Sequence, residues 1–383
     1  MPTIVIAPDS FKESLDATNV AQAIATGWRS ICPEDTLIIH PMADGGEGTM
    51  DAILSVLQGE TREAHVTDPL GRNIKAFWGW LPDSGTAIIE MAQASGLHLL
   101  TPEERCPMKA CTYGTGELIK AALDAGAQTI ILTLGGSATN DGGSGMLKAL
   151  GLQLLDSNGA PLPPGGAALQ NLARIDISQL DTRLKQVCFI AACDVDNPLC
   201  GPRGASAIFG PQKGATPDMV QHLDKALAHY AQICVNTLHT DHCNTCGAGA
   251  AGGTGFAALT FLNASFRPGV ELVAELTGLA QTLRHAHLVI TGEGKLDAQT
   301  LHGKTPMGVM KLAGPLNIPV ITLAGTLGEG YQQLYAHGLT AAFSITPGPI
   351  SLQHSQAQIR ELLAHRAADI ARLWTISYRK TKK

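Results

Sequence analysis

Short runs of β-branched residues alternate with helical patterns at both ends of the chain, and this alternation constrains the fold more than any other feature. The first run is Thr3–Ala7 and the second is Thr36–His40; between them Val20, Ile24 and Trp28 recur every four residues, which predicts a helix. Helices that alternate with strands are typical of a parallel sheet covered by crossover connections. The sequence therefore predicts an α/β fold.

The alternation stops near residue 62 and resumes near residue 284. Three more strands are predicted there: His287–Thr291, Pro319–Ala324 and Ala341–Ile345. Together, the five strands from the two chain ends would form one flavodoxin-like, doubly wound parallel sheet. We predict a discontinuous flavodoxin-like domain of residues 1–62 and 284–383, interrupted by a large inserted α/β domain of residues 63–283. Three consecutive domains are the alternative.

The inserted region begins with an antiparallel pattern. Strands separated by turn residues are predicted at Ala64–Thr67, Asn73–Trp80 and Ala87–Met91. Two buried strands, Thr129–Leu134 and Val187–Ala192, follow further along the chain. Thr216 starts a helix that extends to about Leu238, because a hydroxyl cap, a proline and an acidic residue succeed one another there.

Composition excludes several classes of protein. Of 383 residues, 45% are hydrophobic and 16% charged, which rules out a disordered or coiled-coil chain, and a net charge of −6 offers no attraction for nucleic acid or an anionic membrane. No apolar run reaches the roughly 18–20 residues that span a bilayer. The N-terminus shows no secretion signal, and the odd number of cysteines favours reduced thiols. We expect a cytoplasmic protein with small-molecule partners; its oligomeric state, a homo-oligomer included, stays open.

Polar or glycine-rich loops follow four of the predicted parallel strands. Their residues are Asp9, Ser10 and Lys12, then Asp44–Glu47, then Gly292–Asp297, and last Gly325–Thr326. Ligands of open α/β sheets bind at the carboxyl ends of the strands. Four such loops at one edge are more than turns require, so the sequence predicts a ligand site there.

The inserted region offers two further segments of this kind. Leu134–Gly143 follows a strand and opens a helix, so its amides could approach a phosphate, although a plain glycine-rich turn is the alternative. Asp194 and Asp196 follow another strand and suit either Mg²⁺ coordination or proton abstraction from a hydroxyl. Lys213 lies on a tight turn and would face an anion or, alternatively, be a solvated surface lysine.

Several short motifs fail on inspection. His302–Thr305 resembles the end of a P-loop, but Ala298 stands where the first glycine is required. Gly247–Gly252 fits the dinucleotide fingerprint without a preceding strand, and we interpret it as a flexible glycine loop. Four residues with side chains that can bind zinc lie close together: His239, His242, Cys243 and Cys246. Their spacings are short and no second ligand pair is present, so a helix end with incidental polar residues is favoured over a zinc site.

The chemistry of these candidates is that of phosphoryl transfer. Glycines for phosphate, lysines for charge and carboxylates for metal and base work are present, and positioning with charge neutralisation does most of the work in this reaction. The rival hypotheses are a nicotinamide oxidoreductase that uses the Gly247–Gly252 segment and a sugar-acid binding protein without catalysis.

Six motifs, in order along essentially the whole chain, resemble the signatures of the bacterial glycerate kinase type 1 family. They are Ile6–Ser14, Ala43–Gly48, Gly135–Thr139, Ala192–Leu199, Phe209–Ala215 and Thr291–Asp297. The resemblance implies ATP-dependent phosphorylation of D-glycerate to 2-phosphoglycerate, dependence on Mg²⁺, and a step in glyoxylate or sugar-acid breakdown. It also implies a flavodoxin-like domain with an inserted α/β domain.

Residue roles follow from the chemistry of that reaction. Glycerate needs a clamp on its carboxylate, for which we predict Ser10 and Lys12, with Asn197 on a hydroxyl. Asp194 is the first candidate for the base that accepts the 2-hydroxyl proton, and Asp44 is the second.

The remaining predicted roles concern the nucleotide and its charge. Lys213 and Lys295 would neutralise the moving phosphoryl group, and Glu293 and Asp297 would face the metal, although Asp297 alternatively caps a helix. The phosphates of ATP would lie in a cradle formed by Gly135, Gly136, Ser137 and Asn140.

Overall fold

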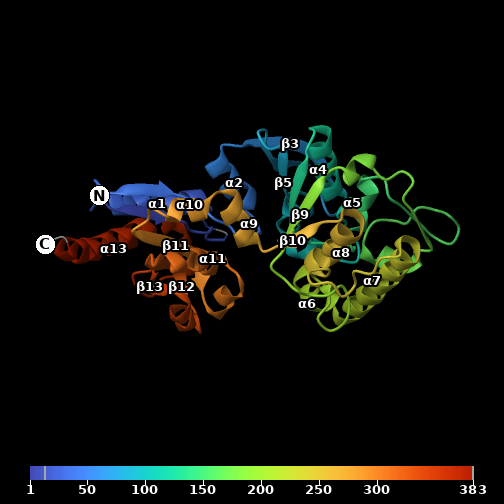
Figure 1. The fold of residues 1–383 in the computed structure, drawn as a ribbon. Helices are drawn as coiled ribbons and strands as arrows, with labels where there is room; N and C mark the ends of the chain where they lie inside the picture. Colours follow the sequence, from blue (N-terminus) through green and yellow to red (C-terminus); the bar gives the residue numbers. More distant parts are fainter. Residues whose placement is uncertain (13, 382–383) are drawn as a thin grey trace. The chain divides into compact units, whose positions relative to one another are not determined.

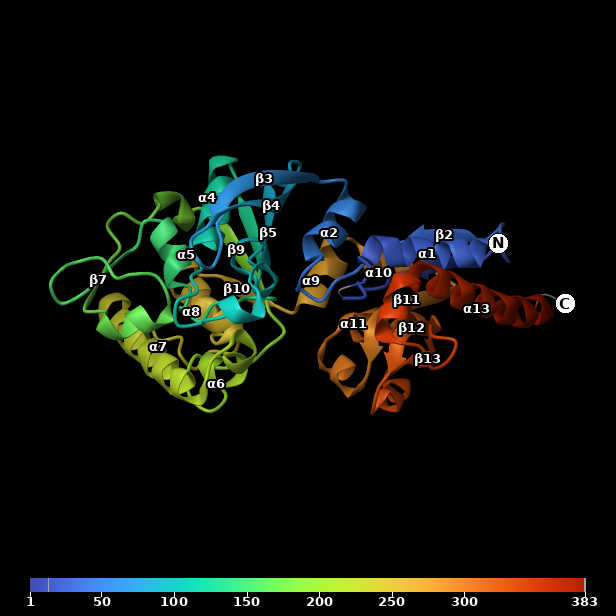
Figure 2. The same ribbon diagram turned by 180° about the vertical axis from the view of Figure 1, so that it is seen from behind.

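The computed structural model describes residues 1–12 and 14–381, which form two compact units. Unit 1 comprises Met1–Asp44, Asp51–Gln58 and Pro268–Lys383, and unit 2 comprises Gly45–Met50 and Gly59–Arg267. Figures 1 and 2 show that the blue N-terminal and the orange and red C-terminal segments build the same unit. Each unit has its own sheet and its own apolar core.

Unit 1 is built on a five-stranded sheet in which every strand pair is parallel. Its order across the sheet is β13 (Leu339–Ser344), β12 (Val320–Leu327), β11 (Leu288–Leu296), β1 (Thr3–Ile6) and β2 (Thr36–Ile39). Numbered along the chain, this is the order 2-1-3-4-5 of flavodoxin-like folds. The predicted flavodoxin-like, doubly wound sheet is confirmed, as are its five strands.

Helices cover both faces of this sheet. On one face α1 (Ala17–Arg29) packs against α13 (Ile359–Thr381), and both contact Ile4, Ile6 and Ile290 in a common core. The alternate residues of the strands face the other side, where α11 packs on β11 and β12. The helices grouped there are α9 (Gly269–Leu276), α10 (Leu279–Leu283) and α11 (Thr305–Ala313).

The unit boundaries differ from the predicted domain boundaries. The chain re-enters unit 1 at Pro268, earlier than the predicted 284, because α9 and α10 pack with α11. A buried hydrogen bond of 2.8 Å between His40 and Thr277 ties the end of α9 to this unit. In the other direction, Gly45–Met50 belongs to unit 2, where the Met50 amide donates to the Glu90 carboxylate over 2.8 Å.

Unit 2 contains a mixed six-stranded sheet. Across the sheet the order is β10 (Ser265–Arg267), β9 (Cys188–Ala192), β6 (Thr129–Thr133), β5 (Thr86–Glu90), β4 (Asn73–Leu81) and β3 (Glu60–Thr67). The predicted antiparallel meander is confirmed in β3, β4 and β5, and the strands from β5 to β10 are parallel. The sequence reading missed β10, and also the small sheet of β7 (Gln153–Leu155) and β8 (Arg174–Asp176).

The helices of unit 2 agree with the prediction where capping residues mark them. Helix α7 (Pro217–Leu238) begins after Thr216, whose hydroxyl accepts from the Met219 amide over 3.3 Å. The predicted glycine loop, Gly247–Gly252, is a buried turn that leads into α8 (Ala250–Leu262), where Ala251, Gly252 and Gly253 have left-handed, non-helical backbone angles. The other α-helices of the chain are α2 (Thr49–Leu57), α3 (Ala92–Ser95), α4 (Tyr113–Asp124), α5 (Ser144–Ala149), α6 (Ala205–Phe209) and α12 (Leu352–Ala357).

Candidate active site

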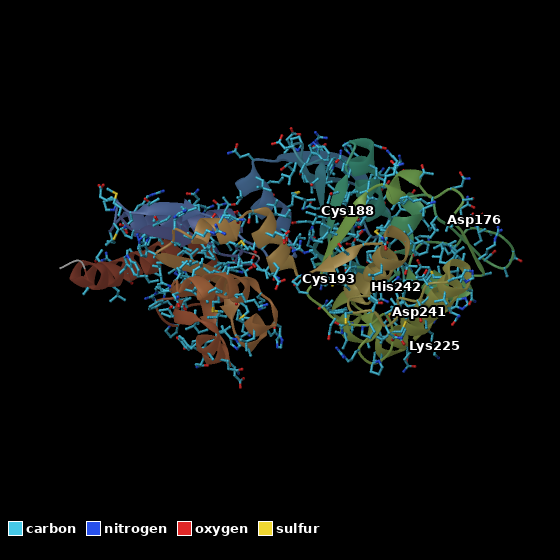
Figure 3. All side chains as sticks on the ribbon, viewed as in Figure 1. Asp176, Cys188, Cys193, Lys225, Asp241 and His242 are labelled. Carbon is cyan, nitrogen blue, oxygen red and sulfur yellow. The ribbon has the colours of Figure 1, made fainter. Side chains whose placement is uncertain are left out.

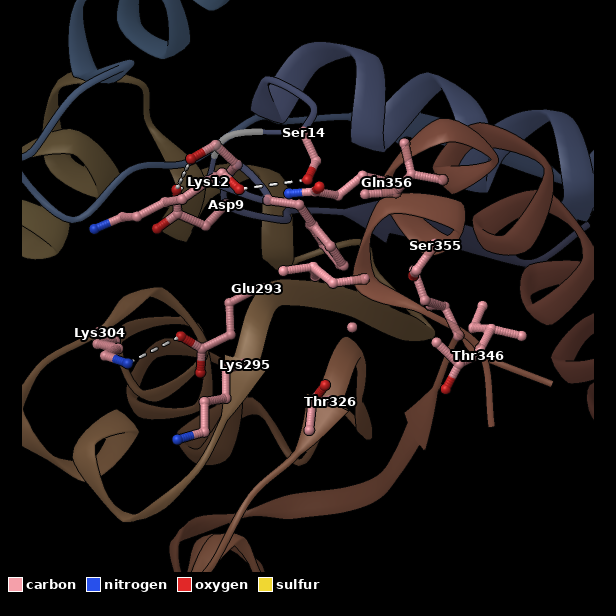
Figure 4. A pocket seen from close by; sticks show the side chains of 18 of the residues that line it. Asp9, Lys12, Ser14, Glu293, Lys295, Lys304, Thr326, Thr346, Ser355 and Gln356 are labelled. Carbon is pink, nitrogen blue, oxygen red and sulfur yellow. Dashed lines mark hydrogen bonds and ion pairs between the residues drawn. The ribbon is translucent and has the colours of Figure 1, made fainter. Parts of the chain in front are cut away.

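A pocket of about 530 Å³ lies in unit 1 beyond the carboxyl ends of β1, β11, β12 and β13 (Figure 4). The chain proceeds from β1 to one side of the sheet and later continues from β11 on the other side. Such a reversal of strand order is where open α/β sheets bind their ligands. The charged residues that line this pocket are Asp9, Lys12, Asp44, Glu293, Lys295 and Lys304.

Asp9 is a buried carboxylate on the wall of the pocket. The Asp9 amide donates to the Gly292 carbonyl over 2.9 Å, which continues the pairing of β1 with β11 and fixes the residue at the sheet edge. Its side chain accepts from the Ser10 amide and from the Thr305 hydroxyl, each over 2.6 Å. Burial, reinforced by the negative charge of Asp44, raises the pKa of Asp9 to about 7.

Glu293 lies on β11 and also faces the pocket. Its Oε1 accepts from the Thr300 hydroxyl over 2.5 Å, and its Oε2 lies 3.5 Å from the Lys304 ammonium. Burial raises the pKa of Glu293, and these two partners oppose the rise. The pocket therefore contains carboxylates that are held in place and only partly compensated by positive charge.

Most of the predicted residues of unit 1 do meet in this pocket. Ser10, Lys12, Asp44, Glu293 and Lys295 all line it. Lys304 lines the pocket and Thr305 contacts Asp9, although neither was predicted as a site residue because their motif lacks the first P-loop glycine. A lysine directly after Gly303 and before a helix was the available signal.

Asp297 has a structural role instead of facing the pocket. Its Oδ1 accepts from the Gln299 amide over 2.9 Å and caps the 3₁₀ turn Ala298–His302. Its Oδ2 lies 2.9 Å from the Lys295 ammonium, and the hydrogen bond to this lysine is the largest cause of the lowered Asp297 pKa. Asp297 is not among the described residues that line the pocket.

The donor set of the pocket fits Mg²⁺ bound together with phosphates. Within residues 1–12 and 14–381, no three His, Cys, Asp or Glu side chains are placed to hold a metal ion by themselves. Mg²⁺ is ordinarily held by one or two carboxylates together with waters and substrate phosphates. Asp9 and Asp44 supply such a pair, and a cation beside them would relieve the repulsion that raises the pKa of Asp9.

The predicted phosphate cradle of unit 2 divides into two parts. Gly136 is exposed and Gly135 half-buried, on the turn after β6. Ser137 and Asn140 are buried, and their side chains contact protein groups: Ser137 accepts from Lys213 over 2.8 Å, and Asn140 donates to Ser206 over 2.9 Å. Ser137 and Asn140 therefore hold the turn in place through their contacts with Lys213 and Ser206.

The amides at the start of α5 are already used by the protein. Asp141 accepts from the amides of Gly143 and Gly145 over 3.2 and 3.1 Å, and from the amide and hydroxyl of Thr112. These hydrogen bonds stabilise a carboxylate that is completely buried. The amides of Gly143 and Gly145 are therefore occupied, and the phosphate cradle stays a prediction for the turn at Gly135 and Gly136.

Lys213 lies inside unit 2, so its interpretation as a surface lysine is wrong. The residue is 2% exposed, and its ammonium donates to the Ser137 hydroxyl and, over 2.6 Å, to the Thr139 carbonyl. Burial lowers the pKa of Lys213 to about 7, while the charge of Asp141 opposes the shift. Lys213 therefore holds the turn after β6 from within.

The acidic segment after β9 forms an irregular loop. Asp194 and Asp196 are exposed. Arg203 organises the segment, because its guanidinium lies 2.8 Å from Asp196 and its carbonyl accepts from the Asn197 amide group over 2.7 Å. Of the predicted residues here, Asn197 is thus engaged in closing the loop, and Asp194 lies at its start.

The His- and Cys-rich segment after α7 is a turn. Asp241 accepts from the Cys243 amide over 2.9 Å, and His242 lies 3.4 Å from the Thr245 hydroxyl (Figure 3). These contacts close the segment locally.

An open sheet with lysines and buried carboxylates at the carboxyl ends of its strands is the framework of an enzyme that acts on phosphorylated ligands. The chain matches the glycerate kinase family over residues 4–375, and it belongs to that family. It is therefore a phosphotransferase, and a kinase of this family implies ATP as co-substrate.

Individual relatives agree with this assignment. The chain is 50% identical to a glycerate kinase of Bacillus subtilis strain 168, over 96% of both chains. It is also 50% identical to glycerate 2-kinase of Escherichia coli K12, over 89% of this chain and 90% of the relative. A crystal structure from Salmonella typhimurium LT2, assigned as a glycerate kinase 2, superposes with a TM-score of 0.88 at 47% identity and covers 99% of both chains.

Among the residues that the structure describes, no helix has the length and apolarity needed to cross a bilayer.

Proposed function

We propose that this chain transfers the terminal phosphoryl group of ATP to D-glycerate and produces 2-phosphoglycerate. The observation that carries the proposal is the pocket at the strand reversal of unit 1, where three lysines and three carboxylates meet. The family and the relative named glycerate 2-kinase support the choice of acceptor and of hydroxyl. Action in the cytoplasm on small molecules alone, without nucleic acid or membrane partners, is part of this proposal.

Magnesium would be held by Asp9 and Asp44, with Glu293 available through water. When bound, it would neutralise charge on the phosphates of ATP. We replace the predicted ligand Asp297 with Asp9, because both Asp297 oxygens are engaged in the cap and the ion pair.

The pocket's other side chains would orient the substrates. Ser10 and Lys12 would clamp the glycerate carboxylate, since a hydroxyl and a flexible ammonium on one loop can bind both of its oxygens. Lys295, now joined by Lys304, would neutralise negative charge that moves with the phosphoryl group. Charge neutralisation by side chains that are already in position lowers the barrier to phosphoryl transfer without a covalent intermediate.

In unit 2, Asp194 remains the proposed acceptor of the 2-hydroxyl proton, with Asp44 of unit 1 as the second candidate. The Asn197 carbonyl oxygen would accept from a glycerate hydroxyl, because its amide nitrogen already donates to Arg203.

The backbone at Gly135 and Gly136 would contact an anionic substrate group. Ser137, Asn140 and Lys213 would act by holding that turn in place.

A coupled assay tests the reaction directly. Purified protein is incubated with Mg·ATP and D-glycerate, and enolase is added without phosphoglycerate mutase. Phosphoenolpyruvate formed at once is the expected result, because enolase accepts only the 2-phosphate. Formation only after mutase is added would move the phosphate to the 3-hydroxyl, and absence of ADP under both conditions would overturn the proposal.

A further inference from the structure

The pocket of unit 1 is larger than a three-carbon acid requires. Its volume of about 530 Å³ lies within the range of sites that enclose drug-sized ligands. Glycerate carries a polar group on every carbon, yet one part of the lining is apolar. The apolar side chains there are Phe11, Ile345, Ile350, Leu352 and Ile359.

Charge is confined to one end of this pocket. Figure 4 shows Asp9, Lys12, Glu293, Lys295 and Lys304 on one side of the pocket and Thr346 and Ser355 on the other, with Gln356 extending toward Ser14. The C-terminal part of the lining, between residues 345 and 359, contains no charged side chain. A ligand that fills the pocket would place an uncharged ring or chain against these residues and a charged group, together with any bound cation, among the three lysines and three carboxylates.

We propose that the neutral end of this pocket, which residues 345–359 form, binds the adenine base of the nucleotide, and that its charged end binds the phosphates. This inference rests on the proposed kinase function and assigns the nucleotide to unit 1. Apolar side chains would cover the faces of the base, and Thr346, Ser355 and Gln356 would supply donors and acceptors for its edge.

The exposure of Leu352 supports an apolar occupant at this end of the pocket. This residue lines the pocket on α12 and is 74% exposed, which makes it one of the most exposed large apolar side chains in the chain. Ser351 fixes the start of the helix, because its hydroxyl accepts from the His354 amide over 3.2 Å. Covering an apolar side chain contributes to affinity in proportion to the area removed from water.

The test fills or charges the neutral end while leaving the charged end intact. Ser355→Trp places a large ring in the space of the base, and Leu352→Asp puts a charge where an apolar face is proposed. Gln353→Trp is the matched control, because Gln353 is exposed on the same helix and does not line the pocket. Binding of Mg·ADP without glycerate is measured by titration calorimetry, together with the KM values for ATP and glycerate and the melting temperature.

We expect both pocket variants to raise the Kd for Mg·ADP and the KM for ATP by at least about tenfold, equivalent to ~1.4 kcal/mol. The KM for glycerate and the melting temperature stay near the wild-type values, and the control variant behaves as the wild type. Folded pocket variants that bind Mg·ADP normally would overturn the inference, as would a change confined to the KM for glycerate.

The failure of the inference and that of the proposed function remain separable. If the variants bind Mg·ADP normally and still phosphorylate glycerate, only the assignment of the adenine base to residues 345–359 is overturned. If the variants bind Mg·ADP more weakly but the wild-type protein does not phosphorylate glycerate, only the proposal that glycerate is the phosphoryl acceptor is overturned.

Discussion

In unit 1 the charged side chains at the carboxyl ends of β1 and β11 line a pocket, whereas in unit 2 those around the turn after β6 are buried in the interior. Asp9 and Glu293 are held by threonine hydroxyls while facing the pocket. Asp141 and Lys213 are also held by hydrogen bonds, but these bonds organise a helix start and a glycine turn.

The difference shows that one sequence pattern can serve two purposes. In both units a strand is followed by glycines, hydroxyls and charged residues. In unit 1 the strand order reverses between β1 and β11, which leaves room at the sheet edge for a ligand. In unit 2 the buried side chains of Lys213 and Asp141 occupy the space beneath the turn and stabilise it.

The largest expected effect concerns the proton acceptor. Asp194→Asn should lower kcat by about 10²–10⁴-fold, the usual contribution of a positioned general base. The melting temperature should not change, because Asp194 is exposed. Steady-state kinetics and thermal unfolding check both expectations.

Asp44→Asn serves as the comparison for that experiment. A full kcat with Asp194→Asn and a large loss with Asp44→Asn would assign the base to unit 1. With Asp44 as a metal-side residue, the variant should mainly raise the Mg²⁺ concentration needed for half-maximal rate.

A second prediction tests the buried lysine of unit 2. The pKa of Lys213 is lowered from 10.5 to about 7, so the folded state binds fewer protons than the unfolded state between these values, and stability rises with pH there. Lys213→Met removes this rise and the two hydrogen bonds. At pH values near 10 the variant should be less stable than the wild type by about 1–3 kcal/mol, and the difference should shrink as the pH falls from about 10 to 7 and level off below 7.

Urea unfolding at a series of pH values measures that difference. Lys225→Met is the matched control, since Lys225 is exposed on α7 (Figure 3). A difference that is the same at every pH would show that the ammonium of Lys213 is not the titrating group.

A smaller effect is expected from the glycine turn. Gly136 has φ +72°, and a Cβ there would lie 2.7 Å from the Glu47 carboxylate. Gly136→Ala should cost about 1–2 kcal/mol for the left-handed conformation, and the shifted turn should also lower kcat/KM.

Gly48→Ala is the control that separates the effect of backbone strain from the effect of moving the Gly136 turn. Gly48 has φ +88° but no neighbour within 4 Å of an added Cβ, so the variant should lose similar stability and keep its activity. Equal kinetic losses in the two variants would contradict a contact between the Gly136 turn and a substrate.

The smallest effect is expected at Asp297. Asp297→Ala should destabilise the protein by about 1 kcal/mol through loss of the cap, and Asp297→Ser should restore most of it. Both variants should keep the Mg²⁺ dependence of the wild type. A raised Mg²⁺ requirement in the serine variant would instead make Asp297 a metal ligand, as the sequence first suggested.

The alternation of strands and helices was sufficient to predict the framework of unit 1. The apolar patterns of the five strands are local, and the preference for right-handed crossover connections limits the strand orders that such a sheet can adopt. The boundary at which the chain re-enters that domain was harder to predict. The strand before it, β10, has only three residues, and α9 and α10 belong to unit 1 because they pack with α11, which no local pattern indicates.

The pocket residues of unit 1 were partly predictable as well. Loops after parallel strands identified Ser10, Lys12, Asp44, Glu293 and Lys295. Lys304 was missed because its motif was judged against a P-loop, and Asp9 was given no role because nothing local to it indicates burial.

The sequence by itself thus determined the sheet, its likeness to a family and the edge at which polar loops gather. Only the tertiary structure decided which polar side chains face a ligand and which are sealed inside. Asp9 meets Thr305 across 296 residues of chain, and Lys213 meets Ser137 across 76. Burial of a charge depends on such distant partners, because only their hydrogen bonds offset the loss of water around it.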